Sequence, residues 1–138
     1  MTNREKYILS IYEELSDMGK HENVKLVKNT VNDGIYIKKT LKNYNIEIYK
    51  ILKNRQIKGI PKVYEIIEDE KELIIIEEYI HGLTLDKKYN KTDVETVKKI
   101  MEQLCNILKQ LHNMNPPIIH RDIKPTNIMV SMMMSYIL

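Results

Sequence analysis

The sequence has few of the residues that cross-link a chain or mark its boundaries. Its 138 residues include a single cysteine, Cys105, with only four glycines and four prolines. One cysteine excludes an internal disulfide and any zinc site built on several thiolates, and it fits a reducing compartment such as the cytoplasm. The sequence also has no internal repeat and no Gly-, Ser- or Pro-rich linker, so composition alone does not divide it into domains.

Long apolar runs and an excess of one charge are absent as well. The apolar stretch over residues 7–12 is short and is followed at once by Glu13 and Glu14, so we expect neither a signal peptide nor a membrane span in this chain. The 22 Lys+Arg residues nearly balance the 19 Asp+Glu residues, for a net charge of +3. This balance gives little support to a nucleic-acid partner. Because 43% of the residues are hydrophobic, we expect a folded core over most of the length.

The first 40 residues predict extended structure after an ambiguous start. Residues 7–15 fit either a helix or a strand that begins near Ile11, and the pattern does not decide between the two. Two apolar segments, residues 24–27 and 35–37, flank the turn signal Asn32-Asp33-Gly34, which predicts a β-hairpin.

A short helix and a second hairpin follow. Asn45 is placed to cap a helix whose apolar face includes Ile48, Ile51 and Leu52, and which ends before the Gly59-Ile60-Pro61 break. Two β-branched runs then flank a charged four-residue connection, which is typical of a hairpin. These strands are predicted over residues 63–67 and 73–76.

The strongest helix signal lies over residues 94–111. Residues 92–95 have capping-box spacing, and the helix is expected to end near His112. Cys105, beside Leu104, is interpreted as a small buried hydrophobe. An extended piece is expected at residues 118–119. The apolar residues that recur at steps of three and four are Val94, Val97, Ile100, Met101, Leu104, Ile107, Leu108 and Leu111.

A run of polar residues after this helix carries the chemistry. His120, Arg121 and Asp122 are followed by Lys124 and Asn127. The run resembles the catalytic loop of protein kinases, and its Lys-Pro-x-Asn form resembles the serine/threonine branch, of bacterial type. Phosphoryl transfer needs a carboxylate that orients the hydroxyl and accepts its proton, a cation on the transferred phosphate, and a neutral oxygen ligand for a metal.

The resemblance implies a role for each of these residues. Asp122 is the expected base, Lys124 the expected contact of the γ-phosphate, and Asn127 the expected ligand of Mg²⁺. His120 and Arg121 are expected to be structural or regulatory. The cofactors implied are ATP and Mg²⁺, and the implied partner is a protein substrate.

The resemblance also implies a lysine that anchors the ATP phosphates on the strand after the first hairpin. Lys39 and Lys38 compete for this role. Lys39 is favoured, because choosing Lys38 would place bulky Tyr36 against the purine, since strand residues two apart share a face. Glu47 is the expected helix partner of this lysine, although the connection of eight residues between them is short for the family.

The adenine ring is expected at the end of the last strand. On the family pattern, the backbone carbonyl of Glu78 and the backbone N–H and carbonyl of Ile80 would bond the purine edge. Glu77 would occupy the position that guards the back pocket, where a glutamate is unusual. The phosphate-covering loop of the family has three glycines, and here only Gly19 stands in that region.

These patterns together predict an α+β fold. It consists of a kinase-like N-lobe, formed by an antiparallel sheet plus one helix, and then the first helices and catalytic loop of the C-lobe. Residues 1–82 are assigned to the N-lobe and hinge, and residues 83–138 to the start of the C-lobe. The sequence contains no phenylalanine and so no Asp-Phe-Gly metal motif. We therefore expect a chain truncated after the catalytic loop, in which part of the 94–111 stripe is exposed or covered by the apolar tail.

The predicted function is that of an ATP-dependent serine/threonine protein kinase-like phosphotransferase, weakly active or inactive as this chain alone. A non-catalytic nucleotide-binding or interaction module, a pseudokinase fragment, is the alternative. A small-molecule kinase of related fold is disfavoured by the Lys-Pro-x-Asn form of the loop.

Overall fold

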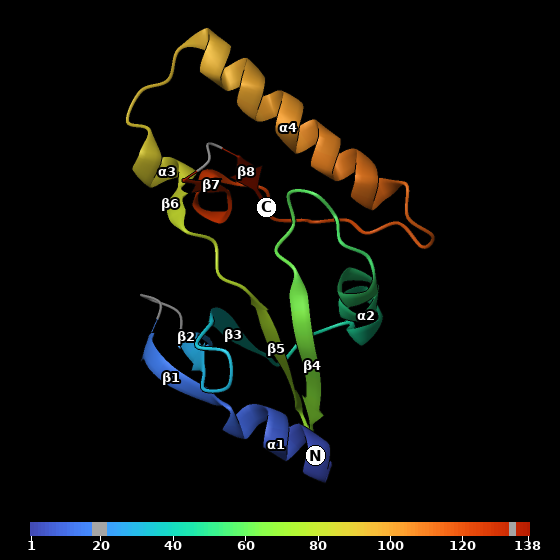
Figure 1. The fold of residues 1–138 in the computed structure, drawn as a ribbon. Helices are drawn as coiled ribbons and strands as arrows, with labels where there is room; N and C mark the ends of the chain where they lie inside the picture. The colour runs from blue at the N-terminus through green and yellow to red at the C-terminus, as the bar shows by residue number, and fades with distance from the viewer. Residues whose placement is uncertain (18–21, 133–134) are drawn as a thin grey trace. The chain divides into compact units, whose positions relative to one another are not determined.

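A computed structural model describes residues 1–17, 22–132 and 135–138 of the chain, and these form two compact units. The first unit comprises Met1–Arg55 and Lys62–Tyr79, and the second comprises Gln56–Pro61 and Ile80–Leu138 (Figure 1). Gly19, the glycine expected above the phosphates, lies outside the described residues.

The first unit is built on a five-stranded antiparallel sheet with strand order β1-β2-β3-β5-β4. The segment over residues 7–15, left undecided by its sequence pattern, contains both alternatives, because a helix ends at Ser10 and a strand begins at Tyr12. The elements of this unit are α1 (Asn3–Ser10), β1 (Tyr12–Asp17), β2 (Val24–Asn29), β3 (Ile35–Leu41), α2 (Ile46–Asn54), β4 (Val63–Asp69) and β5 (Glu72–Glu78).

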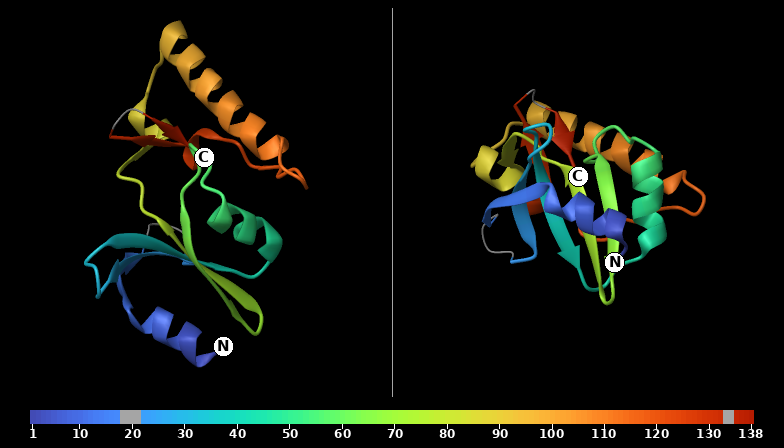
Figure 2. Two further views of the ribbon diagram at one scale, coloured as in Figure 1. Left: turned by 45° about the vertical axis from the view of Figure 1, so that its right-hand side comes forward. Right: turned by 60° about the horizontal axis from the view of Figure 1, so that its bottom comes forward.

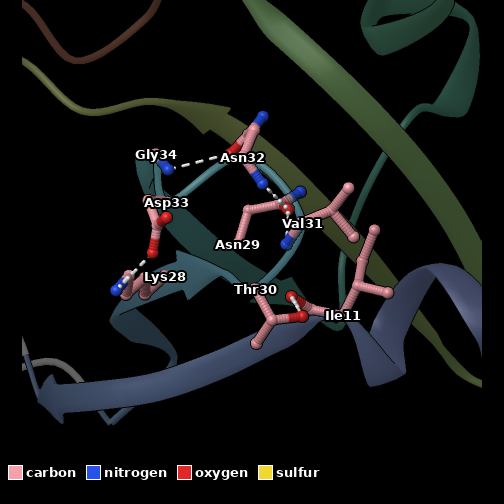
Figure 3. Close-up of polar contacts among 8 residues, drawn as sticks. All are labelled: Ile11, Lys28, Asn29, Thr30, Val31, Asn32, Asp33 and Gly34. Carbon is pink, nitrogen blue, oxygen red and sulfur yellow. Dashed lines mark hydrogen bonds and ion pairs between the residues drawn. The ribbon is translucent and has the colours of Figure 1, made fainter.

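The turn between β2 and β3 fixes the register of the strand that carries both candidate lysines. The Asn29 side chain accepts hydrogen bonds from the backbone N–H groups of Val31 and Asn32, at 2.8 and 3.2 Å (Figure 3). Asn32 in turn accepts from the Gly34 N–H at 2.8 Å. These local side-chain bonds close the predicted hairpin. They leave Lys38 opposite Lys25 on the neighbouring strand.

The core of the first unit lies between the sheet and α2. Val63, Leu73 and Ile75 are buried there, with exposed fractions of 3% or less. Helix α2 packs along β4, as both views of Figure 2 show. The predicted N-cap is confirmed, because the Asn45 side chain accepts a hydrogen bond from the Glu47 N–H at 3.1 Å. The partly buried residues packed against this cluster are Leu41, Tyr44, Ile46, Tyr49, Leu52 and Ile66.

The second unit combines one long helix with a small antiparallel sheet of order β6-β7-β8. Its core includes Ile100, Leu104, Ile107 and Leu111 of the helix, each with an exposed fraction of 7% or less. The elements are β6 (Gly82–Thr84), α3 (Leu85–Lys88), α4 (Val94–His112), the 3₁₀ turn η1 (Pro125–Asn127), β7 (Met129–Ser131) and β8 (Tyr136–Ile137).

The bounds of helix α4 agree with the prediction, but only some residues of its apolar stripe are buried. Val94, Val97 and Met101 are exposed, while β8 packs against the helix. Cys105 is exposed, so its interpretation as a buried hydrophobe is wrong. It follows Leu104 directly, and a step of one residue turns the side chain about 100° away from the buried face.

Two further details of the second unit concern residues 118–119, which follow α4, and the glycine at position 59. Residues 118–119, predicted as an extended piece, are assigned to no strand, and the Ile118 N–H bonds the Leu111 carbonyl at the end of α4, at 3.0 Å. Gly59 has φ of +89°, and a Cβ there would collide with the Ile107 side chain. Glycine is therefore required at position 59 by both the backbone and the packing.

The fold class is α+β, as the sequence predicts: an antiparallel sheet with a packed helix, followed by helices. Within the described residues, no helix is both long enough and apolar enough to cross a membrane.

Candidate functional site

The three residues predicted to carry phosphoryl transfer lie together in the second unit. The Asn127 amide nitrogen donates to the Asp122 carboxylate at 2.9 Å and to the Asp122 backbone carbonyl at 3.0 Å. The Lys124 ammonium lies 3.2 Å from the same carboxylate oxygen. The short turn η1 produces this grouping, because it reverses the chain between Lys124 and Asn127 and returns the amide to Asp122.

The backbone before Asp122 adopts a conformation that few residues tolerate. Arg121 has φ of +68°, in the left-handed region. The Asp122 N–H donates to Nδ1 of the His120 ring at 3.3 Å. A non-glycine residue in this region costs free energy and persists where the surrounding contacts over-determine it. His120 and Arg121 therefore shape the loop that presents Asp122.

Buried residues on either side hold this exposed loop in place. Before it, Ile118 is 7% exposed; after it, Ile128 and Val130 are 3% and 2% exposed. The Ile128 carbonyl accepts a hydrogen bond from the Leu85 N–H at 2.8 Å, which ties the end of the loop to the start of α3. The polar side chains thus project from a short segment with both ends anchored in the unit's core.

The electrostatic environment keeps Asp122 ionised. The hydrogen bond from the Lys124 ammonium, and secondarily that from the Asn127 amide, lower the pKa of the Asp122 carboxyl below its ordinary value of 3.8. Asp122 is therefore a carboxylate at neutral pH. It can accept a hydrogen bond from a hydroxyl group and can take up its proton as that hydroxyl reacts.

The donor set of the loop fits a magnesium ion. Asn127 supplies an amide oxygen, and oxygen ligands of this kind suit Mg²⁺. Because the amide nitrogen of Asn127 faces Asp122, its oxygen points away from that contact. In the part of the chain that the structure describes, no group of three or more His, Cys, Asp or Glu residues could hold a metal ion. Mg²⁺ commonly takes most of its ligands from substrate phosphates and water, so one protein oxygen can suffice.

In the first unit, the two competing lysines have different partners. Lys38 lies 3.0 Å from the Glu14 carboxylate, which Lys25 also contacts at 2.6 Å. Hydrogen bonds from Lys25 and then Lys38 lower the pKa of the Glu14 carboxyl. Lys39 instead forms an ion pair with Glu77 on β5. Since neighbouring strand residues point to opposite faces, Lys39 lies on the face that carries Leu41 and the α2 packing cluster.

The structure does not join Lys39 to the helix residue expected beside it. Among the ion pairs of the described residues, Glu47 pairs with Lys50 at 2.8 Å on α2 itself, and its side chain is 68% exposed. The expected pair of Lys39 and Glu47 is thus not formed, and the carboxylate beside Lys39 is that of Glu77.

The predicted adenine-binding segment lies where the chain passes from the first unit to the second, between Tyr79 and Ile80. The Glu78 N–H donates to the Lys62 carbonyl at 2.9 Å, and its carboxylate accepts from the Lys62 N–H at 3.1 Å. Glu78 is therefore held at the end of the sheet by its N–H and its side chain. Ile80 is half-buried and is the first residue of the longer segment of the second unit, Ile80–Leu138.

The sequence named Glu77 but did not pair it with Lys39. The pairing follows from the antiparallel register of β3 and β5, in which Ile37 faces Glu77 and Lys39 faces Ile75. Residues 42–71 separate these strands in the chain, so no local pattern reveals the contact. In the sequence, Glu77 stands out only as a charged residue at the end of an otherwise apolar run.

Comparison with known proteins identifies the family. The model of the protein kinase domain matches residues 12–137. Serine/threonine-protein kinase PKH1 of Saccharomyces cerevisiae is 33% identical over 117 residues, which cover 83% of this chain and 15% of that protein. Calcium-dependent protein kinase 5 of Plasmodium falciparum is 32% identical over 145 residues, covering 91% of this chain and 25% of that protein.

A bacterial relative matches a shorter stretch. Serine/threonine-protein kinase D of Synechocystis sp. is 38% identical over 71 residues, which cover 51% of this chain and 14% of that protein. The chain thus spans a quarter or less of the length of these three relatives. The match to the domain model nevertheless extends over nearly all of its residues, and the chain belongs to the protein kinase family.

Proposed function

We propose that the chain is part of a serine/threonine protein kinase, in which it binds Mg-ATP and supplies the catalytic loop for transfer of the γ-phosphoryl group to a serine or threonine hydroxyl of a protein substrate. The observation that supports this best is the grouping of Asp122, Lys124 and Asn127 on one anchored, exposed loop. Use of ATP and the single cysteine are both compatible with the cytoplasm.

In this proposal each residue of the loop has one task. Asp122 orients the substrate hydroxyl and accepts its proton as the oxygen attacks phosphorus and the bond to the leaving ADP breaks. Lys124 moves its ammonium from Asp122 toward the transferred phosphate. The Asn127 amide oxygen binds Mg²⁺, which when bound supplies positive charge to the phosphate oxygens.

The nucleotide itself is assigned to residues 1–82, and phosphoryl transfer to residues 83–138. Lys39 would contact the α- and β-phosphates, with Lys38 as the competing candidate. The Glu78 carbonyl and the Ile80 N–H and carbonyl would bond the adenine edge. Lys39 is favoured as the phosphate contact, because the Lys38 ammonium already shares the Glu14 carboxylate with Lys25.

Thermal unfolding with and without Mg-ATP tests nucleotide binding. A ligand that binds only the folded state stabilises it by about 2.7 kcal/mol at a hundredfold excess over Kd, so a clear rise in melting temperature is expected. The rise should vanish in Lys39→Met and persist in Lys38→Met, each variant being compared with itself in the absence of nucleotide. No rise in the unmodified chain would reject the proposal.

Transfer of radiolabelled γ-phosphate to a general protein substrate tests the reaction. Weak labelling by this chain alone is expected, and it should be lost in Asp122→Asn, which preserves the shape of the side chain but not its basicity. Binding of Mg-ATP without any labelling would instead identify a non-catalytic nucleotide-binding module.

A further inference from the structure

Glu77 is a charged residue in an unusually apolar setting. It follows four buried residues on β5, Leu73 to Ile76, and its own side chain is only 12% exposed. A carboxylate with so little access to water is tolerated where a cation and hydrogen-bond donors compensate the lost hydration. The Lys39 ammonium provides that compensation, through the ion pair it forms with a Glu77 carboxylate oxygen.

The backbone ladder between two strands fixes this pair. In the register of β3 and β5, Ile37 lies opposite Glu77 and Lys39 lies opposite Ile75. Lys39 and Glu77 are therefore diagonal neighbours on one face of the sheet, within reach of long side chains. Their contact depends on paired central strands and does not require a particular placement of helix α2.

Helix α2 presents a tyrosine, not a carboxylate, to this face. Ile46, Tyr49 and Leu52 recur at three-residue spacing and pack on the core cluster. Burial, with a smaller contribution from the negative charge of Glu77, raises the pKa of the Tyr49 hydroxyl. Glu47 lies two positions earlier, about 200° around the helix, where its side chain is 68% exposed and paired with Lys50.

We propose that Glu77 is the positioning residue that holds the Lys39 ammonium for the nucleotide phosphates, in place of a carboxylate from α2. This inference rests on the proposed function, in which Lys39 binds ATP. The Lys39 side chain remains 36% exposed. An ammonium has three N–H donors, so contact with Glu77 leaves others for phosphate oxygens. Glu77 acts through Lys39 and does not itself touch the nucleotide phosphates.

A double-mutant cycle on Mg-ATP affinity tests this assignment, with calorimetric titration of the 138-residue chain as the measurement. Glu77→Gln is expected to weaken binding about tenfold, equivalent to about 1.4 kcal/mol. In the Lys39→Met background the same substitution should change affinity less than about twofold, because the group through which it acts is gone. Equal effects in both backgrounds would show a merely structural role and would overturn the inference.

Two further variants complete the design. Glu65→Gln removes the carboxylate of another lysine pair in the same unit, Lys53–Glu65, and should leave affinity unchanged. Glu47→Gln tests the rival partner, and a loss there with none in Glu77→Gln would overturn the inference. If Glu77→Gln does not fold, by circular dichroism, Glu77→Met takes its place in the cycle, since apolar replacements of buried charges are often tolerated.

The same titrations separate this inference from the proposed function. If the unmodified chain does not bind Mg-ATP, the proposed function fails. If Lys39→Met binds Mg-ATP equally well, the assignment of Lys39, and with it the role of Glu77, is rejected, and Lys38 remains the candidate. If Lys39→Met weakens binding and Glu77→Gln does not, the proposed function stands and the role of Glu77 is rejected.

Discussion

Asp122 receives two donors of different kind, an ammonium and an amide, and the two are not equivalent. Lys124 contributes most to the lowered pKa of the Asp122 carboxyl, because its hydrogen bond carries a full positive charge. In the proposed reaction that cation leaves Asp122 for a phosphate. The carboxylate then becomes a stronger base at the point in the reaction where a hydroxyl proton must be accepted.

The first prediction concerns this coupling. Removing the ammonium in Lys124→Ala should raise the pKa of the Asp122 carboxyl toward 3.8, its ordinary value, because the largest lowering contribution is lost. NMR titration of the side-chain carboxyl carbon measures the change. Lys124→Arg keeps a cation at the position and should leave the pKa low. An unchanged pKa in Lys124→Ala would mean that the ion pair does not persist in solution.

The second prediction concerns stability and compares two adjacent lysines. Lys39→Met leaves the Glu77 carboxylate, 12% exposed, without its cation, whereas Lys38→Met leaves Glu14 paired with Lys25. The cost of breaking a buried pair is reduced here because Lys39 is partly solvated, so about 1 to 2 kcal/mol is expected for Lys39→Met, against about 0.5 or less for Lys38→Met. Urea denaturation without nucleotide measures both. Equal costs would contradict the argument from the two carboxylates, of which Glu77 is far less exposed than Glu14.

The sequence was informative about single residues where the contacts are local. Asp122, Lys124 and Asn127 lie within six positions of one another, so the 3₁₀ turn that begins at Pro125 is enough to bring them together. The partner of Lys39 could not be predicted in this way, because it depends on which strands are neighbours and in which register.

Among the helices and strands, the sequence predicts most clearly those that have both a capping residue and a regular repeat of apolar residues. Helix α4 is predicted over residues 94–111 and extends over Val94–His112, and apolar residues recur along one face. The cap itself is Asp93, which accepts from the Thr96 N–H, and not the Thr92 of the predicted capping box. The sequence predicts extended segments less clearly where they lack a capping residue or a defined turn. At residues 118–119, where an extended piece is expected, the structure assigns no strand, and the Ile118 N–H bonds the Leu111 carbonyl at the end of α4.

The third prediction is a pH dependence of the α4 N-terminus. The Asp93 side chain accepts a hydrogen bond from the Thr96 N–H at 2.7 Å, and this bond lowers the pKa of the Asp93 carboxyl below 3.8. A lowered folded-state pKa means that the folded chain binds the proton less tightly than the unfolded chain. The stabilisation by this cap is therefore complete above about pH 3.8 and is lost as the pH falls through the folded-state value.

Hydrogen exchange of the Thr96 amide across this pH range measures the loss of the cap. Asp93→Asn provides the matched control, because asparagine caps helices about as well as aspartate but does not titrate. Protection at Thr96 should fall with acid in the unmodified chain and stay constant in Asp93→Asn, after correction for the intrinsic exchange rate. Parallel behaviour of the two proteins would show that the Asp93 carboxylate does not hold the cap.

For the whole molecule, each of the two units buries apolar residues of its own. One cluster forms around Val63, Leu73 and Ile75, and the other around the buried face of α4 with Ile128 and Val130. The segment Gln56–Pro61 groups with the second unit, although it lies between α2 and β4 of the first. No local sequence pattern predicts this grouping, because it depends on long-range contacts such as the bond from the Leu138 N–H to the Gly59 carbonyl, at 2.9 Å.

The fourth prediction is that a glycine substitution destabilises one unit and not the other. Gly59→Ala forces a methyl group into the Ile107 side chain at a backbone φ of +89°, and strain plus overpacking should cost about 2 to 4 kcal/mol. Because Gly59 and Ile107 both belong to the second unit, amide exchange should accelerate in α4 and β7 while β3 and β5 keep their protection.

Gly34→Ala is the matched test in the first unit, where a Cβ would lie 2.8 Å from the Tyr36 ring in the turn between β2 and β3. It should accelerate exchange in β2 and β3 and leave α4 protected. Hydrogen exchange read by mass spectrometry on both variants gives the two patterns side by side. If each substitution instead lowers protection equally throughout the described residues, the chain unfolds as one cooperative body, and the nucleotide-binding and transfer segments could not be destabilised separately.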